Sequence, residues 1–118
     1  MVANSGKEVI PTMTKAEKLF HQIGEQLPNA TESKRFGAFC IKATNGKLVA
    51  IFWKDHVMFK LNKDDEKKAL RFKGARQGTH LYATDRKMKG WVLVPFSHSS
   101  KWRDLAKKSI DFVMGTTE

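Results

Sequence analysis

Alternating apolar and polar positions along residues 35–61 predict three consecutive antiparallel strands. The dipeptide Asn45-Gly46 separates two apolar runs, and both residues tolerate the positive φ that a two-residue type I′ hairpin requires. A second reversal is expected at 54–56. The three strands should therefore form a meander. They are predicted at residues 36–43, 47–53 and 57–61.

Capping residues predict a helix on each side of this meander. Thr14 and Glu17 have the spacing at which a hydroxyl and a carboxylate satisfy backbone N–H groups at a helix start. Apolar residues then recur at spacings of three and four until Pro28. Asn62 can cap a second helix with an acidic first turn, which the helix dipole favours, and Gly74 should end it.

The rest of the chain predicts two more strands and a third helix. A short strand is expected around 80–82 and another at 91–94, with a polar loop at 84–90 between them. A serine within 97–100 can cap the third helix, whose apolar stripe begins with Trp102, interpreted as a core anchor. The combined pattern predicts an α+β fold with an antiparallel sheet.

Length and composition indicate one soluble domain. The chain has 118 residues and is 41% hydrophobic, enough for one core, and no apolar run approaches the roughly 20 residues that span a bilayer. Residues 1–12 lack the apolar stretch of a secretory signal, so we expect a cytoplasmic protein without a membrane segment. Cys40, the single cysteine, fits a buried apolar position. The expected organisation is a flexible leader at 1–12, a domain at 13–115 and a flexible tail at 116–118.

Positive charge is concentrated between residues 67 and 89. The net charge is +10, and this segment holds eight basic residues against one acid, Asp85. Such a basic field attracts nucleic-acid phosphates through counterion release, although it can also serve only to keep the protein soluble. The candidate phosphate contacts are Lys67, Lys68, Arg71, Lys73, Arg76, Arg86, Lys87 and Lys89.

Patterns typical of catalysis, metal binding or cofactor binding are missing from the sequence. The four histidines are far apart, and no cysteine cluster completes a metal-site spacing. There is no G-x-S-x-G elbow, and the acids at 64–66 fit a first helical turn better than an acid–base pair. The glycines are spread over turns instead of forming a phosphate loop. We therefore predict a non-enzymatic protein with no catalytic residue, metal or cofactor.

Aromatic residues near the basic segment favour phosphate contact over base stacking. Phe72 and Trp91 lie in elements that need core residues, which leaves Tyr82 as the free ring, and a stacking surface normally uses more than one. No helix-turn-helix, zinc-finger or basic-zipper pattern is present. We therefore predict that the chain binds nucleic acid without reading the base sequence.

Several short motifs together resemble a known family. They are Arg35-Phe36-Gly37, Asn45-Gly46-Lys47, Met58-Phe59-Lys60-Leu61, Met88-Lys89-Gly90-Trp91 and Val94-Pro95. Over residues 14–114 the chain resembles the bacterial TfoX N-terminal domain group (TfoX/Sxy) and the related YjbR/MmcQ-like proteins. The resemblance implies a secretion-chaperone-like α+β fold with element order α-β-β-β-α-β-β-α, a role in regulating DNA-uptake competence, and DNA binding in the YjbR-like branch. Where the family usually has Arg-Pro-Met, this chain has Arg86-Lys87-Met88, which makes that loop more basic.

These observations leave two main hypotheses. The first is a cytoplasmic regulatory or binding module that contacts nucleic-acid phosphates through the eight basic residues. The second is a protein-interaction or dimerisation module without nucleic-acid binding, suggested by Phe52, Trp53 and Met58 in strands that are apolar on both faces. An enzyme for a small acidic substrate is a third and weaker hypothesis, which a deep pocket with convergent polar groups would support.

Overall fold

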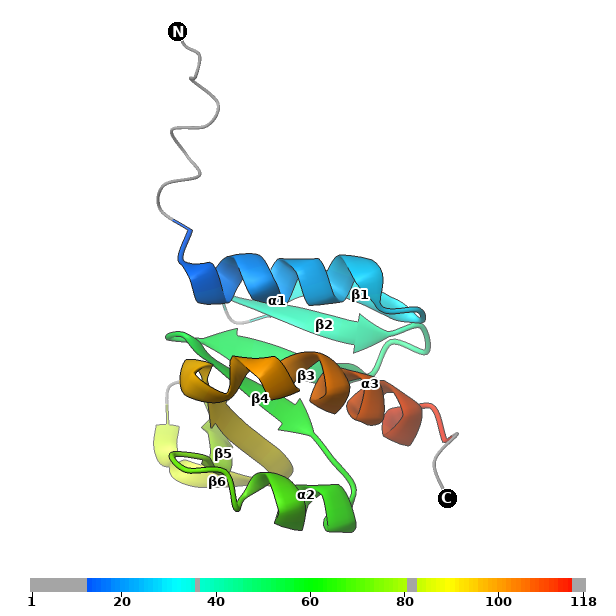
Figure 1. Cartoon of the computed structure of the whole chain (residues 1–118). Coiled ribbons are helices and arrows are strands. Elements are labelled where there is room, and N and C mark those ends of the chain that lie inside the picture. The colour runs from blue at the N-terminus through cyan, green and yellow to red at the C-terminus, as the bar shows by residue number, and fades with distance from the viewer. Residues whose placement is uncertain (1–12, 36, 81–82, 116–118) are drawn as a thin grey trace, which may run out of the picture.

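A six-stranded antiparallel sheet lies behind three α-helices in the computed structural model, which describes residues 13–35, 37–80 and 83–115 (Figure 1). The strand order across the sheet is β1-β2-β3-β4-β6-β5. This architecture confirms the predicted α+β class. The elements in chain order are α1 (Lys15–Gln26), β1 (Ala30–Arg35), β2 (Ala38–Ala43), β3 (Leu48–Trp53), β4 (His56–Lys60), α2 (Lys63–Ala69), β5 (Arg76–His80), β6 (Ala83–Pro95), the 3₁₀ segment η3 (Phe96–Lys101) and α3 (Trp102–Val113).

The predicted caps of the first two helices are present. The Glu17 N–H donates to Thr14 Oγ1 at 3.1 Å, and the Thr14 N–H donates to Glu17 Oε1 at 2.9 Å, which completes the capping box of α1. The Asp65 N–H donates to Asn62 Oδ1 at 2.8 Å at the start of α2. The predicted end of α2 at Gly74 is wrong, because the helix stops at Ala69 and turns follow it.

The third helix begins differently from the prediction. A 3₁₀ segment, η3, occupies residues 96–101, and no side chain caps either η3 or α3, so the predicted serine cap is wrong. Trp102 opens α3 instead and is fully buried, which confirms it as a core anchor. Its indole Nε1–H donates to the Val94 carbonyl at 3.3 Å, so the one polar atom of the ring is satisfied inside the core.

The predicted meander is confirmed, but its turns differ in type. The Asn45-Gly46 reversal joins β2 to β3, yet only Gly46 has a positive φ (86°), and an extra residue, Val49, bulges where the register shifts. The two-residue turn lies at Lys54 and Asp55, whose φ values of 50° and 62° are those of a type I′ hairpin. Backbone pairing thus imposes the left-handed conformation on two residues that do not favour it.

Three features of the predicted strand order need correction. A fourth strand, β1, precedes the meander and pairs with β2, so the order is α-β-β-β-β-α-β-β-α. The polar loop predicted at 84–90 is instead part of β6, which spans 13 residues. The strand predicted at 80–82 is replaced by β5 at Arg76–His80, and residues 81–82 lie outside the described part of the chain.

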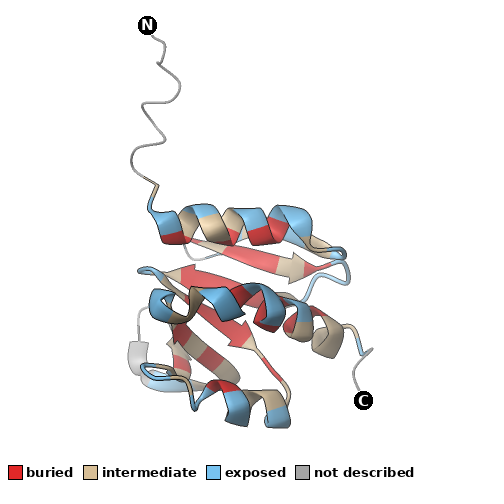
Figure 2. Cartoon of the chain, in the orientation of Figure 1, coloured by how far each residue is buried: buried red, intermediate tan, exposed pale blue. Residues whose placement is uncertain are grey.

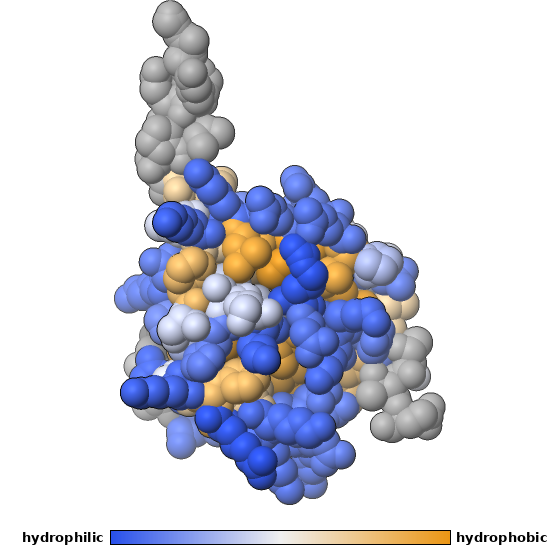
Figure 3. All heavy atoms as spheres, viewed as in Figure 1, coloured by the Kyte–Doolittle hydropathy of each residue, from blue (hydrophilic) through white to orange (hydrophobic). Residues whose placement is uncertain are grey.

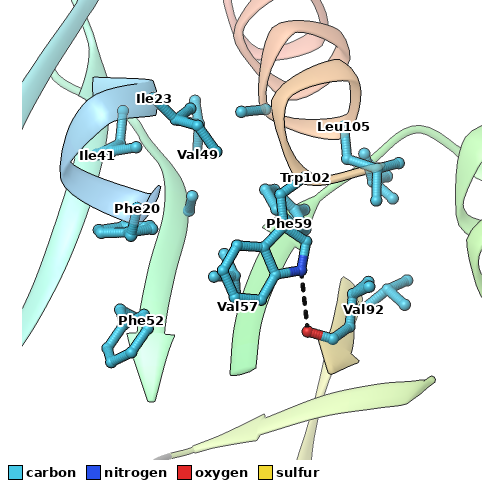
Figure 4. Packing of buried hydrophobic residues seen from close by; sticks show 14 of the residues in the cluster. Phe20, Ile23, Ile41, Val49, Phe52, Val57, Phe59, Val92, Trp102 and Leu105 are labelled. Carbon is cyan, nitrogen blue, oxygen red and sulfur yellow. Dashed lines mark hydrogen bonds between the residues drawn. The ribbon is translucent and has the colours of Figure 1, made fainter. Parts of the chain in front are cut away.

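The helices pack on one face of the sheet, which we call the helix-covered face. Buried positions follow the sheet and the inner sides of the helices, while exposed positions lie on the outer sides (Figure 2). Figure 4 shows Trp102 packed among strand residues that include Val57, Phe59 and Val92. The bulge turns both Val49 and Ala50 into this core, and the buried Ser109 hydroxyl donates to the Val49 carbonyl at 2.9 Å.

A second apolar cluster lies on the opposite face of the sheet, which we call the open face. Its buried residues are Ala38, Cys40, Ile51 and Met58, and the partly exposed residues packed on them are Leu48, Trp53, Trp91 and Leu93. All eight come from strands, and no described helix residue belongs to the cluster. The sheet therefore has one face under helices and one face without them.

Candidate nucleic-acid interface

The eight predicted contact residues are all exposed. They belong to α2, the turns that follow it, β5 and the first half of β6. In Figure 1, these elements occupy the lower end of the molecule. The residues are Lys67 and Lys68 on α2, Arg71 and Lys73 in the turns, Arg76 on β5, and Arg86, Lys87 and Lys89 on β6.

Two of these side chains meet at a cavity between β5 and β6. Arg76 and Lys87 line a space of about 430 Å³ together with Gln77, Thr79 and Leu93. The register of the β5–β6 hairpin shifts twice here, between Gln77 and Thr79 and between Thr79 and His80. The two strands are therefore irregularly paired at the cavity. The cavity offers two cations, an amide and a hydroxyl beside an apolar wall, a set that suits an anionic ligand with an apolar part.

Lys89 lies at a second cavity, together with two lysines that are not among the eight predicted contacts. Lys60 and Lys63 line this space of about 350 Å³ together with Lys89, and Glu66 and Phe112 are also at its wall. Lys60 Nζ donates to the Lys89 carbonyl at 3.3 Å. Lys60 and Lys63 lie outside the 67–89 segment and reach Lys89 only because β4 pairs with β6, so the sequence alone gave no signal for this grouping.

Four of the five remaining basic residues lie on α2 and the turns that follow it, and the fifth, Arg86, lies on β6. The backbone carbonyl of Lys73 lies 2.9 Å from His98 Nε2, and the imidazole of His98 stacks on Phe72 with 5.2 Å between ring centroids. These contacts hold the turn after α2 against η3. The exposed side chains of Lys67, Lys68, Arg71 and Lys73 extend from this anchored segment, and neither cavity includes them.

The carboxylates whose side chains the structure describes, a set that leaves out Asp85 on β6, lie away from the open face. Seven of them lie on helices, the Glu32 carboxylate bonds to His21 of α1, and the Asp55 carboxylate accepts a hydrogen bond from the Thr14 hydroxyl at 2.9 Å. The helical ones are Glu17, Glu25, Asp64, Asp65, Glu66, Asp104 and Asp111. Among the described side chains, no carboxylate forms an ion pair with any of the eight candidates.

Two aromatic assignments are changed or left open by the structure. Phe72 packs against the helix-covered core as expected. Trp91, which the sequence analysis also assigned to the core, lies on the open face and is partly exposed, because its neighbours in β6 alternate between the two faces. Tyr82, the predicted free ring, lies outside the described residues.

Cys40 on β2 is a buried free thiol in the cluster of the open face, and its burial is as predicted for a small apolar residue. Burial raises the pKa of this thiol above its ordinary value of 9.0, and the positive charges of Arg35 and Lys42 oppose the rise. The register of the strands places both cations on the same face of the sheet as Cys40. Over the described ranges, no group of three or more potential metal ligands is found, and no helix is long and apolar enough to cross a membrane.

Comparisons with known proteins give no match to a family model, to a curated protein or to a solved structure. The resemblance to the TfoX N-terminal group therefore stays a prediction.

Proposed function

We propose that this chain is a non-enzymatic regulatory or binding module that contacts nucleic-acid phosphates through its basic end. The observation that carries the proposal is a set of eight exposed cations on α2, β5 and β6, none of them paired with a described carboxylate. Cations that form no ion pair with a described carboxylate are available to displace the counterions of a nucleic acid. The resemblance to the YjbR-like proteins points to the same class of ligand.

The binding that we propose follows the backbone and not the base sequence. α2 has seven residues and is about 10 Å long, which is short for a helix that reads the major groove. Five of the eight residues are lysines, and a lysine meets a phosphate as a point charge, without the two-bond geometry of arginine on guanine. Affinity for different duplexes of equal length should therefore be similar.

Titration of labelled duplex DNA at two salt concentrations tests this function. We expect binding at about 50 mM salt that falls by orders of magnitude at about 200 mM, because several phosphate contacts release counterions. A triple variant, Lys67→Gln, Lys68→Gln and Arg71→Gln, should weaken binding and reduce the slope of log affinity against log salt. The matched control is Lys15→Gln, Lys18→Gln and Lys107→Gln, which also removes three positive charges, at exposed positions of α1 and α3. An unchanged slope in the triple variant would rule out this surface.

A protein-interaction or dimerisation module is the second candidate function. The open face supports it, because Trp53 and Met58 lie in the apolar cluster that no described helix covers. Phe52, the third residue behind this hypothesis, faces the helix-covered core and does not contribute. Sedimentation velocity over a range of protein concentrations tests self-association, and a single monomeric species throughout would count against a homodimer.

A further inference from the structure

The register of the sheet defines which side chains share the open face. Antiparallel partners point to the same side, and Ile51 pairs with Met58, which in turn pairs with Leu93. The same rule extends the face to basic residues on four strands. They are Arg35, which pairs with Ala38, Lys42, which pairs with Leu48, Lys60, which pairs with Trp91, and Arg76, which pairs with Leu93.

Two tryptophans lie at opposite ends of this face. Trp53 pairs with the first residue of β4, His56, and Trp91 pairs with the last, Lys60. Four residues along β4 and two strand spacings across the sheet separate them, so their Cα atoms are about 16 Å apart. Both rings are partly exposed on the buried cluster beneath them. Aromatic rings on a sheet surface are the platforms on which unpaired bases stack.

Each tryptophan has a cation beside it. Lys54 Nζ lies 5.4 Å from the centre of the Trp53 ring, and Lys60 is the direct cross-strand neighbour of Trp91. Leu93, two residues after Trp91 on β6, forms the wall of the 430 Å³ cavity between β6 and β5 that Arg76 and Lys87 also line. A nucleic-acid strand laid across this face from β3 towards β5 would therefore meet one ring, then the second ring, and then a hollow with two cations.

Charge decides which partner this face suits. Every carboxylate whose side chain the structure describes belongs to a helix or is hydrogen-bonded to α1 or its cap, and the side chain of Asp85 on β6 lies outside that description. Among the described side chains, the open face therefore presents basic residues without acids. Two copies of the chain packed face to face would bring their rows of cations together, which costs free energy. A polyanion with flat apolar groups fits both the basic residues and the exposed tryptophan rings of this face.

We propose that the open face binds single-stranded nucleic acid, with Trp53 and Trp91 stacking on bases and Lys42, Lys60 and Arg76 contacting phosphates. This inference rests on the proposed function and narrows its ligand. A duplex keeps its bases stacked inside and cannot offer them to the two rings, so single strands bind here in preference to duplex.

The test compares a labelled single strand of about 12 nucleotides with its duplex by fluorescence anisotropy. The critical variant is Trp53→Leu with Trp91→Leu, and its matched control is Trp53→Phe with Trp91→Phe, which keeps two rings. We expect the leucine variant to bind the single strand at least about tenfold more weakly, and the phenylalanine variant to stay within about threefold of the natural chain. Tryptophan fluorescence of the natural chain should be quenched by the single strand, since Trp53 and Trp91 stack on bases while Trp102 is buried.

A second variant keeps the test decisive if the leucine variant fails to fold. Lys42→Glu reverses a charge on the open face and leaves both rings in place, and Lys107→Glu makes the same change on the exposed side of α3. The first should weaken single-strand binding more than the second.

The outcomes separate this inference from the function on which it rests. Equal binding of single strand and duplex, unaffected by either the leucine variant or Lys42→Glu, would overturn the inference and leave phosphate binding intact. Absence of binding to both nucleic acids would overturn both. A dimer that the leucine variant dissociates would assign the open face to a second copy of the chain and also overturn the inference.

Discussion

The helix-covered face and the open face of the sheet both bury apolar side chains, but only the first lies under helices. On the helix-covered face, α1 and α3 place large residues such as Phe20 and Trp102 against the strands. The outward surface of this layer is mostly hydrophilic, with apolar side chains visible between α1 and α3 (Figure 3). On the open face, the strands themselves supply the cover, and Trp53 and Trp91 remain partly exposed.

The two faces therefore differ in how much their side chains contribute to the free energy of folding. A side chain sealed between two layers contributes to the free energy of folding in proportion to its buried area. A partly exposed ring contributes less to folding and keeps surface for a ligand. The acids whose side chains are described follow the same division, because they lie on the helices or are bonded to α1 or its cap.

Trp102→Ala, on the helix-covered face, should cause the largest loss of stability. The ring is fully buried and donates to the Val94 carbonyl, so its removal leaves a cavity and should cost about 3–5 kcal/mol in the free energy of unfolding. Urea denaturation measures this loss. Trp91→Ala on the open face is the matched change and should cost less, since part of that ring is already in water. Equal losses would mean that the open face is as well sealed as the other.

Gly78→Ala tests how tightly β5 packs on the open face. A Cβ at this position would lie 2.8 Å from the Cβ of Trp91 and 3.0 Å from the sulfur of Met58, so we expect a loss of about 1–3 kcal/mol in stability.

Gly24→Ala on α1 is the control for that substitution. Its new Cβ would also be crowded, at 2.7 Å from Cγ of Glu32, but this side chain is exposed and can move away, and alanine favours the helix. Thermal unfolding should show a smaller loss for Gly24→Ala than for Gly78→Ala. The reverse order would contradict the close packing of β5 on Trp91.

Thr14→Ala addresses the link between the helix layer and the sheet. The hydroxyl caps α1 and donates to Asp55 in the β3–β4 turn, so its loss should cost about 1 kcal/mol. Thr14→Ser keeps both hydrogen bonds and should retain most of the stability in chemical denaturation. If serine and alanine lower stability equally, the threonine methyl group and not the cap is what matters.

Cys40 gives the smallest expected effect, through pH. Its pKa is raised in the folded state by burial, so above pH 9.0 the unfolded chain loses the thiol proton first and the folded state is progressively destabilised. The contribution of this thiol is present below pH 9.0 and declines as the pH rises towards the folded-state pKa. The free energy of unfolding, measured by denaturation at several values between pH 8 and pH 10, should therefore fall more steeply with pH for the natural chain than for Cys40→Ala. Parallel curves would mean that the thiol is not buried in solution.

Locally determined features of this fold were predictable from the sequence. The capping box of α1 and the Asn62 cap depend on residues within one helical turn, and the stripe of α3 depends on a period of 3.6 residues. Each could be found because the interacting residues are neighbours in the sequence.

The strands that were not predicted depend on pairing with segments that are distant in the sequence. The strand β1 has the sequence ATESKR, with no apolar alternation, and is extended because β2 supplies its hydrogen bonds. The first half of β6 is polar and was predicted to be a loop, yet it pairs with β5.

The same division holds for the candidate site. Exposure of the eight basic residues could be expected from their charge. The addition of Lys60 and Lys63 and the position of Trp91 on the open face follow from the register of β4 and β6, which no short segment of sequence determines.

The composition of β1 also has a consequence for the behaviour of the protein at high concentration. An edge strand with unpaired backbone groups can add strands from other molecules and seed aggregates. Here the edge carries threonine, glutamate, serine, lysine and arginine in succession, and Lys34 and Glu32 turn back onto Phe39 and His21. Charged side chains along an edge oppose such growth. The chain can therefore keep a sheet face uncovered by helices while its β1 border resists the stacking of strand upon strand that leads to fibrils.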